Sequence, residues 1–206
     1  MRGMLAGFLG KGSSMELNPS MLDELISRIA KRAKTTGMAT SSVEDKVTFP
    51  PISGTAFDEE ERRLGIRLPV LIKRLYTEVG NGGFGPGEGL LSLRPLSAAD
   101  HPISYFHGKF RAARNRVDAE WPSTIVPFCH WGDLILSCMD MSAELADPPV
   151  IRFEPNMSKL DTLDFLQGRR FRGTGMIPEK ETLSGWLEDW LEGREMLGRP
   201  YNPLVR

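Results

Sequence analysis

The segment GNGGFGPGEGL, residues 80–90, holds six glycines and constrains the fold more than any other part of the chain. Gly80, Gly82 and Gly85 fit the G-x-G-x-x-G pattern of dinucleotide sites, which has meaning only between a strand and a following helix. Here the residues before Gly80 have the apolar spacing of a helix, and GLLSL at 89–93 is typical of a strand. Because this order is the reverse of a Rossmann site, we interpret the glycines as ending a helix and turning the chain.

Five segments are expected to be helices, and those near residues 20–33, 69–79 and 178–196 have apolar residues at the spacing of an amphipathic helix. Asp58 is expected to cap the second of them, with Glu59–Glu61 as its solvated first turn and Gly65 just beyond its end. Pro69 suits the first turn of the third. The helices are expected near residues 20–33, 58–64, 69–79, 101–120 and 178–196.

Two further segments have the apolar pattern of strands. STIVPFCHWGDLILSCMD, residues 123–140, predicts two strands around a turn at Trp131–Asp133, and PPVIRFEP predicts another strand. The Thr-, Ser- and Gly-rich residues 34–47 are interpreted as a linker or mobile loop. The sequence therefore predicts an N-terminal segment with one helix, residues 1–47, followed by a domain over residues 48–206.

Charge and cysteine content restrict the class of protein. The 206-residue chain has a net charge of −1, so no basic excess indicates binding to nucleic acid or to an acidic membrane surface. No apolar run approaches the roughly 18 residues of a membrane span. Cys129 and Cys138 are expected to be buried thiols in a reducing compartment, which predicts a cytoplasmic protein; a disulfide between them is the alternative.

The sequence also contains two basic runs, Arg111–Arg116 and Arg169–Arg172. They are interpreted as solvated faces, and the alternative is a clamp for an acidic partner or RNA.

No set of residues predicts catalysis or metal binding. His101 and His107 are six apart and do not share a helix face as a zinc-binding pair does. His130 forms the best local group, with Cys129 and Asp133, but neighbouring residues of a strand point to opposite faces of the sheet. No catalytic residue, metal or cofactor is therefore expected, and an enzyme with an unrecognised site stays as a remote alternative.

The order of these signals resembles the SMI1/KNR4 family of the SUKH superfamily. The first similar stretch, residues 59–93, has an acidic helix start, L-G-x-x-L-P, a helix ending in N-G, a glycine-rich loop and a strand. The strand, Gly-Asp turn and strand at 125–140 follow, and then VIRFEP and TLSGWLEDWLEG. The resemblance covers about residues 48–193 and departs from the family at Cys129–Gly132 and at an insertion over 156–176. In the first stretch it is carried by Leu64, Gly65, Leu68, Pro69, Asn81 and Gly82.

This resemblance implies an α+β fold, with helices packed on a mostly antiparallel sheet, to which the helix near residues 20–33 would be an addition. It also implies function by binding. Many bacterial members look like immunity proteins, which dock onto a toxin encoded beside them and neutralise it.

We therefore expect a non-catalytic bacterial immunity protein that occludes the active site of a polymorphic toxin, with no direct contact to nucleic acid or membrane. The expected partner-binding residues are Asn81, Glu88, Trp131 and Asp133, on loops and the exposed sheet face. Trp131 is either packed beneath a loop or displayed as an interface anchor. The alternative function is a scaffold or regulatory interaction module without a toxin partner.

Overall fold

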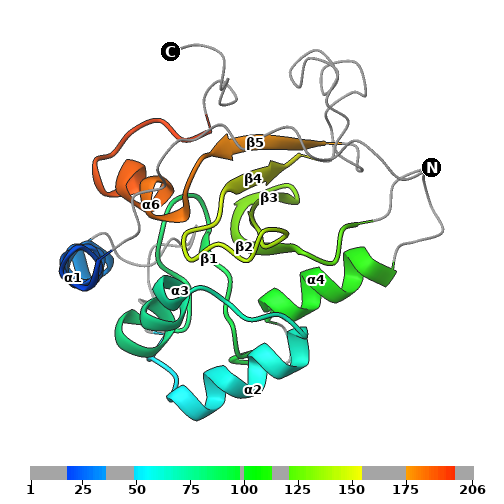
Figure 1. The fold of residues 1–206 in the computed structure, drawn as a ribbon, viewed down its shortest axis with the longest axis horizontal. Helices are drawn as coiled ribbons and strands as arrows, with labels where there is room; N and C mark the ends of the chain where they lie inside the picture. The colour runs from blue at the N-terminus through cyan, green and yellow to red at the C-terminus, as the bar shows by residue number, and fades with distance from the viewer. Residues whose placement is uncertain (1–17, 36–48, 98–99, 113–120, 155–174, 198–206) are drawn as a thin grey trace.

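The computed structural model describes residues 18–35, 49–97, 100–112, 121–154 and 175–197, which are built around a five-stranded antiparallel sheet (Figure 1). The strands lie side by side in chain order, and the expected α+β fold is confirmed. The strands are β1 Gly89–Leu90, β2 Ile125–Gly132, β3 Ile135–Asp140, β4 Val150–Phe153 and β5 Met176–Lys180. The helices are α1 Pro19–Thr35, α2 Gly54–Leu64, α3 Val70–Arg74, η1 Leu75–Val79, α4 Ile103–Ala112 and α6 Leu183–Leu191.

Strand β5 corrects the sequence analysis, which placed residues 178–196 in one helix. Its residues pair with β4 at the edge of the sheet, with Pro178 in the strand. Proline is tolerated at an edge because one side of the strand lacks a partner for its backbone nitrogens. The helix begins only after Thr182, whose hydroxyl accepts a hydrogen bond from the Gly185 amide at 3.1 Å.

The start of α2 also differs from the expectation, because Ser53 caps the helix and Asp58 does not. The Ser53 hydroxyl accepts a hydrogen bond from the Ala56 amide at 3.2 Å, which places the helix start before Asp58. Asp58 lies inside the helix and forms an exposed ion pair with Lys73 at 2.7 Å.

The sequence predicted that the acidic run Glu59–Glu61 of α2 is a solvated first turn, and this prediction is wrong for one of its residues. Glu60 is 1% exposed and its carboxylate pairs with the Arg63 guanidinium at 3.2 Å. Gly65 ends the helix as predicted, with a φ of 70° and its N–H donating to the Glu61 carbonyl.

The glycine-rich loop follows a helix and leads into a strand, as predicted. Helix α3 continues as the π-helical turn η1, which ends at Val79 with Gly80 as its C-cap. The buried Tyr76 hydroxyl donates to the Leu91 carbonyl at 2.6 Å and so ties this helix to the chain beyond the loop. Strand β1 covers only Gly89–Leu90, which is shorter than the strand expected over residues 89–93.

One hydrophobic cluster joins the helices to the sheet. Leu25, Ile26 and Ile29 of α1 belong to it, and each is at most 5% exposed. Trp186 and Trp190 of α6 belong to the same cluster, at 1% and 6% exposure. Figure 1 shows α1 beside α6 at the left of the molecule, where the two helices contact each other. The N-terminal helix is therefore packed onto the body of the domain.

Several expectations concern residues outside the described ranges. Helix α4 covers the first part of the helix expected over 101–120, and Arg114 and Arg116 lie beyond its described end. The second basic run, Arg169–Arg172, and most of the linker expected over 34–47 also lie outside the described residues.

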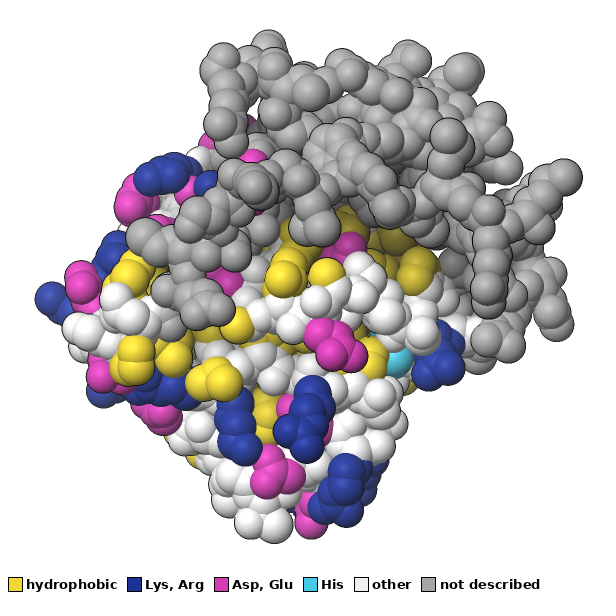
Figure 2. Space-filling view, viewed as in Figure 1, with side chains coloured by type: hydrophobic (Ala, Val, Ile, Leu, Met, Phe, Trp, Pro, Cys, Tyr) yellow, Lys and Arg dark blue, Asp and Glu magenta, His cyan; other side chains and the backbone are white. Residues whose placement is uncertain are grey.

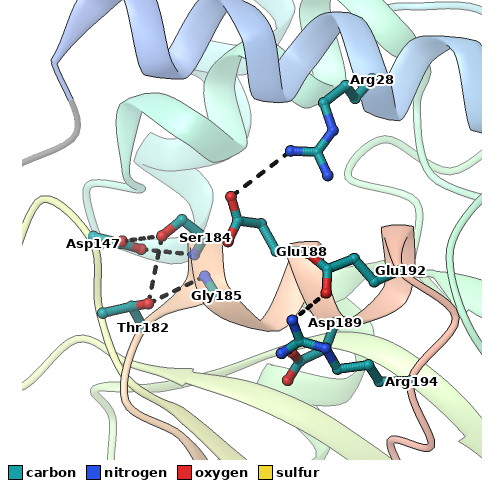
Figure 3. Close-up of polar contacts among 9 residues, drawn as sticks. All are labelled: Arg28, Asp147, Thr182, Ser184, Gly185, Glu188, Asp189, Glu192 and Arg194. Atoms are coloured by element: carbon teal, nitrogen blue, oxygen red, sulfur yellow. Dashed lines mark hydrogen bonds and ion pairs between the residues drawn. The ribbon is translucent and has the colours of Figure 1, made fainter.

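Polar contacts fix α6 between α1 and the loop after β3 (Figure 3). The Asp147 carboxylate accepts hydrogen bonds from the Ser184 amide at 2.9 Å and from the Ser184 hydroxyl at 2.5 Å. On the side of α1, Arg28 lies 3.9 Å from Glu188, and both side chains are substantially exposed. Because exposed ion pairs contribute little to stability, the Asp147 contact is expected to be the stronger one.

Replacing Asp147 with alanine is expected to lower the free energy of unfolding by about 2 kcal/mol, because both Ser184 donors lose their acceptor. Urea denaturation of Asp147→Ala, Ser184→Ala and the double variant measures this and the coupling between the two side chains. Glu192→Ala, which breaks only an exposed ion pair with Arg194, is the control and should change stability by less than about 0.5 kcal/mol. Equal effects of Asp147→Ala and Glu192→Ala would contradict the prediction.

Candidate protein-interaction surface

The glycine-rich loop lies against the end of β2. The Glu88 amide donates to the His130 carbonyl at 2.9 Å, and this hydrogen bond fastens the loop to the strand. A Cβ atom on Gly87, which has a φ of 60°, would lie 2.7 Å from the Trp131 ring. Glycine at this position therefore allows the loop to approach the indole closely.

The β2–β3 hairpin turns one residue later than the sequence indicated. Gly132 pairs with Ile135, so Asp133 and Leu134 are the two turn residues, and Trp131 lies in β2. Both turn residues have positive φ, at 50° and 64°, as the central residues of a type I′ turn do. Such turns favour Asn and Gly, so the Leu134 backbone is held in a conformation that leucine rarely adopts.

Leu134 is a candidate that the sequence analysis missed. Its side chain is 44% exposed at the tip of the hairpin, beside the exposed Asp133. In the sequence, alternation with Leu136 and Cys138 assigned Leu134 to an apolar face. The two-residue turn breaks that alternation, and the local sequence pattern does not indicate the position of the turn.

Glu88 stands at the rim of the same region. Its carboxylate pairs with His130 Nδ1, and its side chain is 57% exposed. The other ring nitrogen of His130 is buried without a hydrogen-bond partner among the described residues, and the ring lies 5.8 Å from Phe106. The histidine therefore holds the Glu88 carboxylate at the surface while it packs inward itself.

Trp131 is half buried, between the two alternatives left open by the sequence. Its indole Nε1 donates to the Ser137 hydroxyl at 2.8 Å, and its ring meets Trp186 edge-on at 6.3 Å. These contacts fix the ring orientation and leave part of the side chain accessible. We refer to Glu88, Trp131, Asp133 and Leu134 as the hairpin–loop surface.

A buried carboxyl group lies beneath Trp131. The Ser137 hydroxyl that accepts from the indole donates in turn to Glu179 Oε2 at 2.7 Å. Burial raises the pKa of Glu179, while the hydrogen bond from Ser137 and the nearby Arg152 act in the opposite direction. Because the sequence placed Glu179 in a helix, this chain of hydrogen bonds was not foreseen.

Glu179 is expected to make the stability depend on pH. The folded state keeps its proton to a higher pH than the unfolded state, so stability falls as pH rises from the ordinary glutamate pKa of 4.5 toward the raised value. Above that window the loss is complete. Urea denaturation across this range should show the stability of Glu179→Gln gaining on that of the wild type as pH rises. A constant difference between the two proteins across the range would refute the prediction.

Asn81, the fourth expected contact residue, lies inside the molecule. It is 1% exposed, and its amide group donates to the Arg94 carbonyl at 2.6 Å. The Asn81 side-chain oxygen accepts from the amides of Leu93 and Arg94, both at 3.1 Å. These three hydrogen bonds join the start of the glycine-rich loop to the chain that follows β1, so the side chain shapes the loop from within.

A comparison with known families supplies the context of this surface. Residues 51–172 match the model described as the SMI1 / KNR4 family (SUKH-1). The chain belongs to this family. SUKH domains are protein-interaction domains of the immunity-protein type and are generally non-catalytic. None of the curated proteins compared with the chain matches it.

Three elements of this SUKH protein lie outside the matched residues, namely α1, β5 and α6. They are nevertheless part of the same interior, because Ile29, Met176 and Trp186 belong to the hydrophobic cluster that joins the helices to the sheet. The structural unit therefore extends beyond the matched residues at both ends.

Neither cysteine of this SUKH protein is a reactive thiolate. Cys129 and Cys138 are free and buried, and burial raises the pKa of both thiols well above the ordinary value, so neither is a thiolate at neutral pH. Within the same residues, no group of three His, Cys, Asp or Glu side chains could hold a metal ion, and no helix is long and apolar enough to cross a membrane. On the face seen in Figure 2, acidic, basic and apolar side chains are interspersed without a large field of one sign.

Proposed function

We propose that this SUKH protein is a bacterial immunity protein that acts in the cytoplasm and neutralises a cognate polymorphic toxin by docking over its active site. The observation that carries the proposal is Leu134, a 44%-exposed leucine with a φ of 64° at the tip of a hairpin. Strained residues of this kind persist where the surrounding structure fixes them, and they concentrate at binding sites.

The chemistry around Leu134 supports a protein partner. Leu134 is an exposed apolar side chain next to Asp133 in the turn, and β2 of the same hairpin contributes the partly exposed Trp131 and His130, which pairs with the Glu88 carboxylate. Tight complexes combine a desolvated apolar or aromatic centre with complementary charges at the rim. A toxin with a basic active-site cleft, such as a nuclease, would match these two acids. In this proposal Asn81 acts by shaping the loop that presents Glu88.

Co-expression with the toxin domain encoded beside this gene tests the proposal. Wild-type protein should restore the growth of cells that produce the active toxin. Leu134→Ser and Trp131→Ala should weaken binding of the purified toxin by about 30-fold or more each, as expected for interface anchors. Leu145→Ser is the matched control, because Leu145 has the same 44% exposure but lies outside the hairpin–loop surface.

The outcomes separate the two candidate functions. Loss of rescue by folded Leu134→Ser with retention by Leu145→Ser would support neutralisation through the hairpin–loop surface. Failure of the soluble wild-type protein to protect against a demonstrably active toxin would reject neutralisation of that toxin. A scaffold or regulatory module with another partner would then be the better description.

A further inference from the structure

A second surface, at the opposite end of the β2–β3 hairpin, has no role in the proposed toxin contact. It is a groove of about 880 Å³ between the α2–α3 junction, the end of α4 and the loop after β3. Strand β2 is eight residues long and rises about 3.3 Å per residue, which puts the groove about 25 Å from the hairpin tip. Both surfaces can therefore be occupied at the same time.

Large apolar side chains are exposed on two sides of this groove. Val70, at the start of α3, is 63% exposed, and Leu145, in the loop after β3, is 44% exposed. Among the described residues, only Asp133, Leu134 and Glu144 are non-glycine residues with positive φ. Two of them form the hairpin tip, and Glu144 lies in this groove beside Leu145.

The charges that line the groove are mainly positive. Arg67 and Arg111 are exposed there, and neither guanidinium has an acidic partner among the described residues. Glu144 is the single acidic residue in the described lining. Two guanidinium groups that have no acidic partner among the described residues, beside exposed apolar side chains, complement a segment that carries both carboxylates and large apolar residues.

We propose that this groove binds an acidic, amphipathic segment of a protein partner other than the toxin. Its apolar side chains would lie between Val70 and Leu145, and its carboxylates would pair with Arg67 and Arg111. Nucleic acid is a poorer match, because stacking platforms and a continuous basic track are missing from the described lining. The protein would then hold two protein partners at opposite ends of one sheet.

Selection from a displayed library of random short peptides tests this proposal directly, because the peptides report the preferred chemistry. Wild-type protein is the bait, and Val70→Asp is used to remove peptides that bind elsewhere. The enriched peptides should carry net negative charge and at least one large apolar residue. Arg67→Glu and Arg111→Glu should each weaken the best peptide by about tenfold, whereas Arg62→Glu, in the neighbouring helix α2 but outside the groove lining, should not.

Each outcome supports or contradicts the binding of an acidic segment in this groove. Binding of a selected acidic peptide that Leu134→Ser leaves unchanged would support it even if toxin neutralisation fails. Basic peptides, no enrichment over Val70→Asp, or equal losses in the Arg67 and Arg62 variants would overturn it. Preferential binding of a short RNA, or self-association that Val70→Asp abolishes, would assign the groove to nucleic acid or to a second copy of the chain instead.

Discussion

Replacing Gly82 with alanine is expected to lower the free energy of unfolding by about 4 kcal/mol, because backbone strain and overpacking add at this position. Gly82 has a φ of 87°, where a side chain is strained. A Cβ atom would also lie 2.5 Å from the Leu91 carbonyl oxygen and 2.7 Å from the Leu90 carbonyl oxygen. These are backbone atoms, and the Leu90 carbonyl already accepts from Gly83 at 2.7 Å, so neither can move aside without breaking the loop.

Gly54→Ala is the matched control for this prediction. Gly54 lies in the first turn of α2, its added Cβ would meet nothing within 4 Å, and its backbone needs no positive φ. Its substitution should change stability by less than about 0.5 kcal/mol. Urea or thermal denaturation of both variants measures the difference. Similar stabilities would show that the loop tolerates a side chain and that the glycines are not required by close packing.

The role of the glycine-rich loop could be predicted from the sequence, since glycines after a helical pattern and before a strand pattern have few interpretations. The boundaries of the flanking elements were less predictable. Ser53 was missed as a cap because Gly54 and Thr55 are weak helix formers and hide the first turn of α2. Strand β5 was missed because Pro178, Glu179 and Lys180 are poor strand formers whose pairing depends on β4.

The candidate site was only partly predictable for a related reason. Trp131 and Asp133 were named as expected contacts because a Gly-Asp turn between strand patterns is visible in the sequence. Leu134 was not, because its exposure depends on which two residues form the turn, and that register is set by pairing across the whole hairpin. Asn81 was named as a contact, although asparagine beside glycines is equally suited to satisfying buried backbone groups.

Replacing Asn81 with alanine is expected to lower the free energy of unfolding by about 3 kcal/mol, because two backbone amides and one carbonyl lose their partner in a buried position. Asn81→Asp separates the donor from the acceptor role. A charged aspartate can still accept from the amides of Leu93 and Arg94, but it faces the Arg94 carbonyl with an oxygen in place of a donor.

The aspartate variant should therefore be pH-dependent in a defined direction. Protonated, it can donate to the Arg94 carbonyl as the amide does, so the folded state is expected to bind the proton more tightly than the unfolded state. Stability should be highest at low pH and fall as pH rises through the pKa of the folded state, while Asn81→Ala should be shifted equally relative to wild type at every pH. Denaturation at several pH values measures this dependence.

The same variants separate a structural role of Asn81 from a direct contact with the toxin. If both variants fold with wild-type stability but lose toxin protection, Asn81 is a direct contact, and its buried arrangement does not persist in the complex. If stability falls as expected, the effect of Asn81 on toxin binding passes through the loop that carries Glu88.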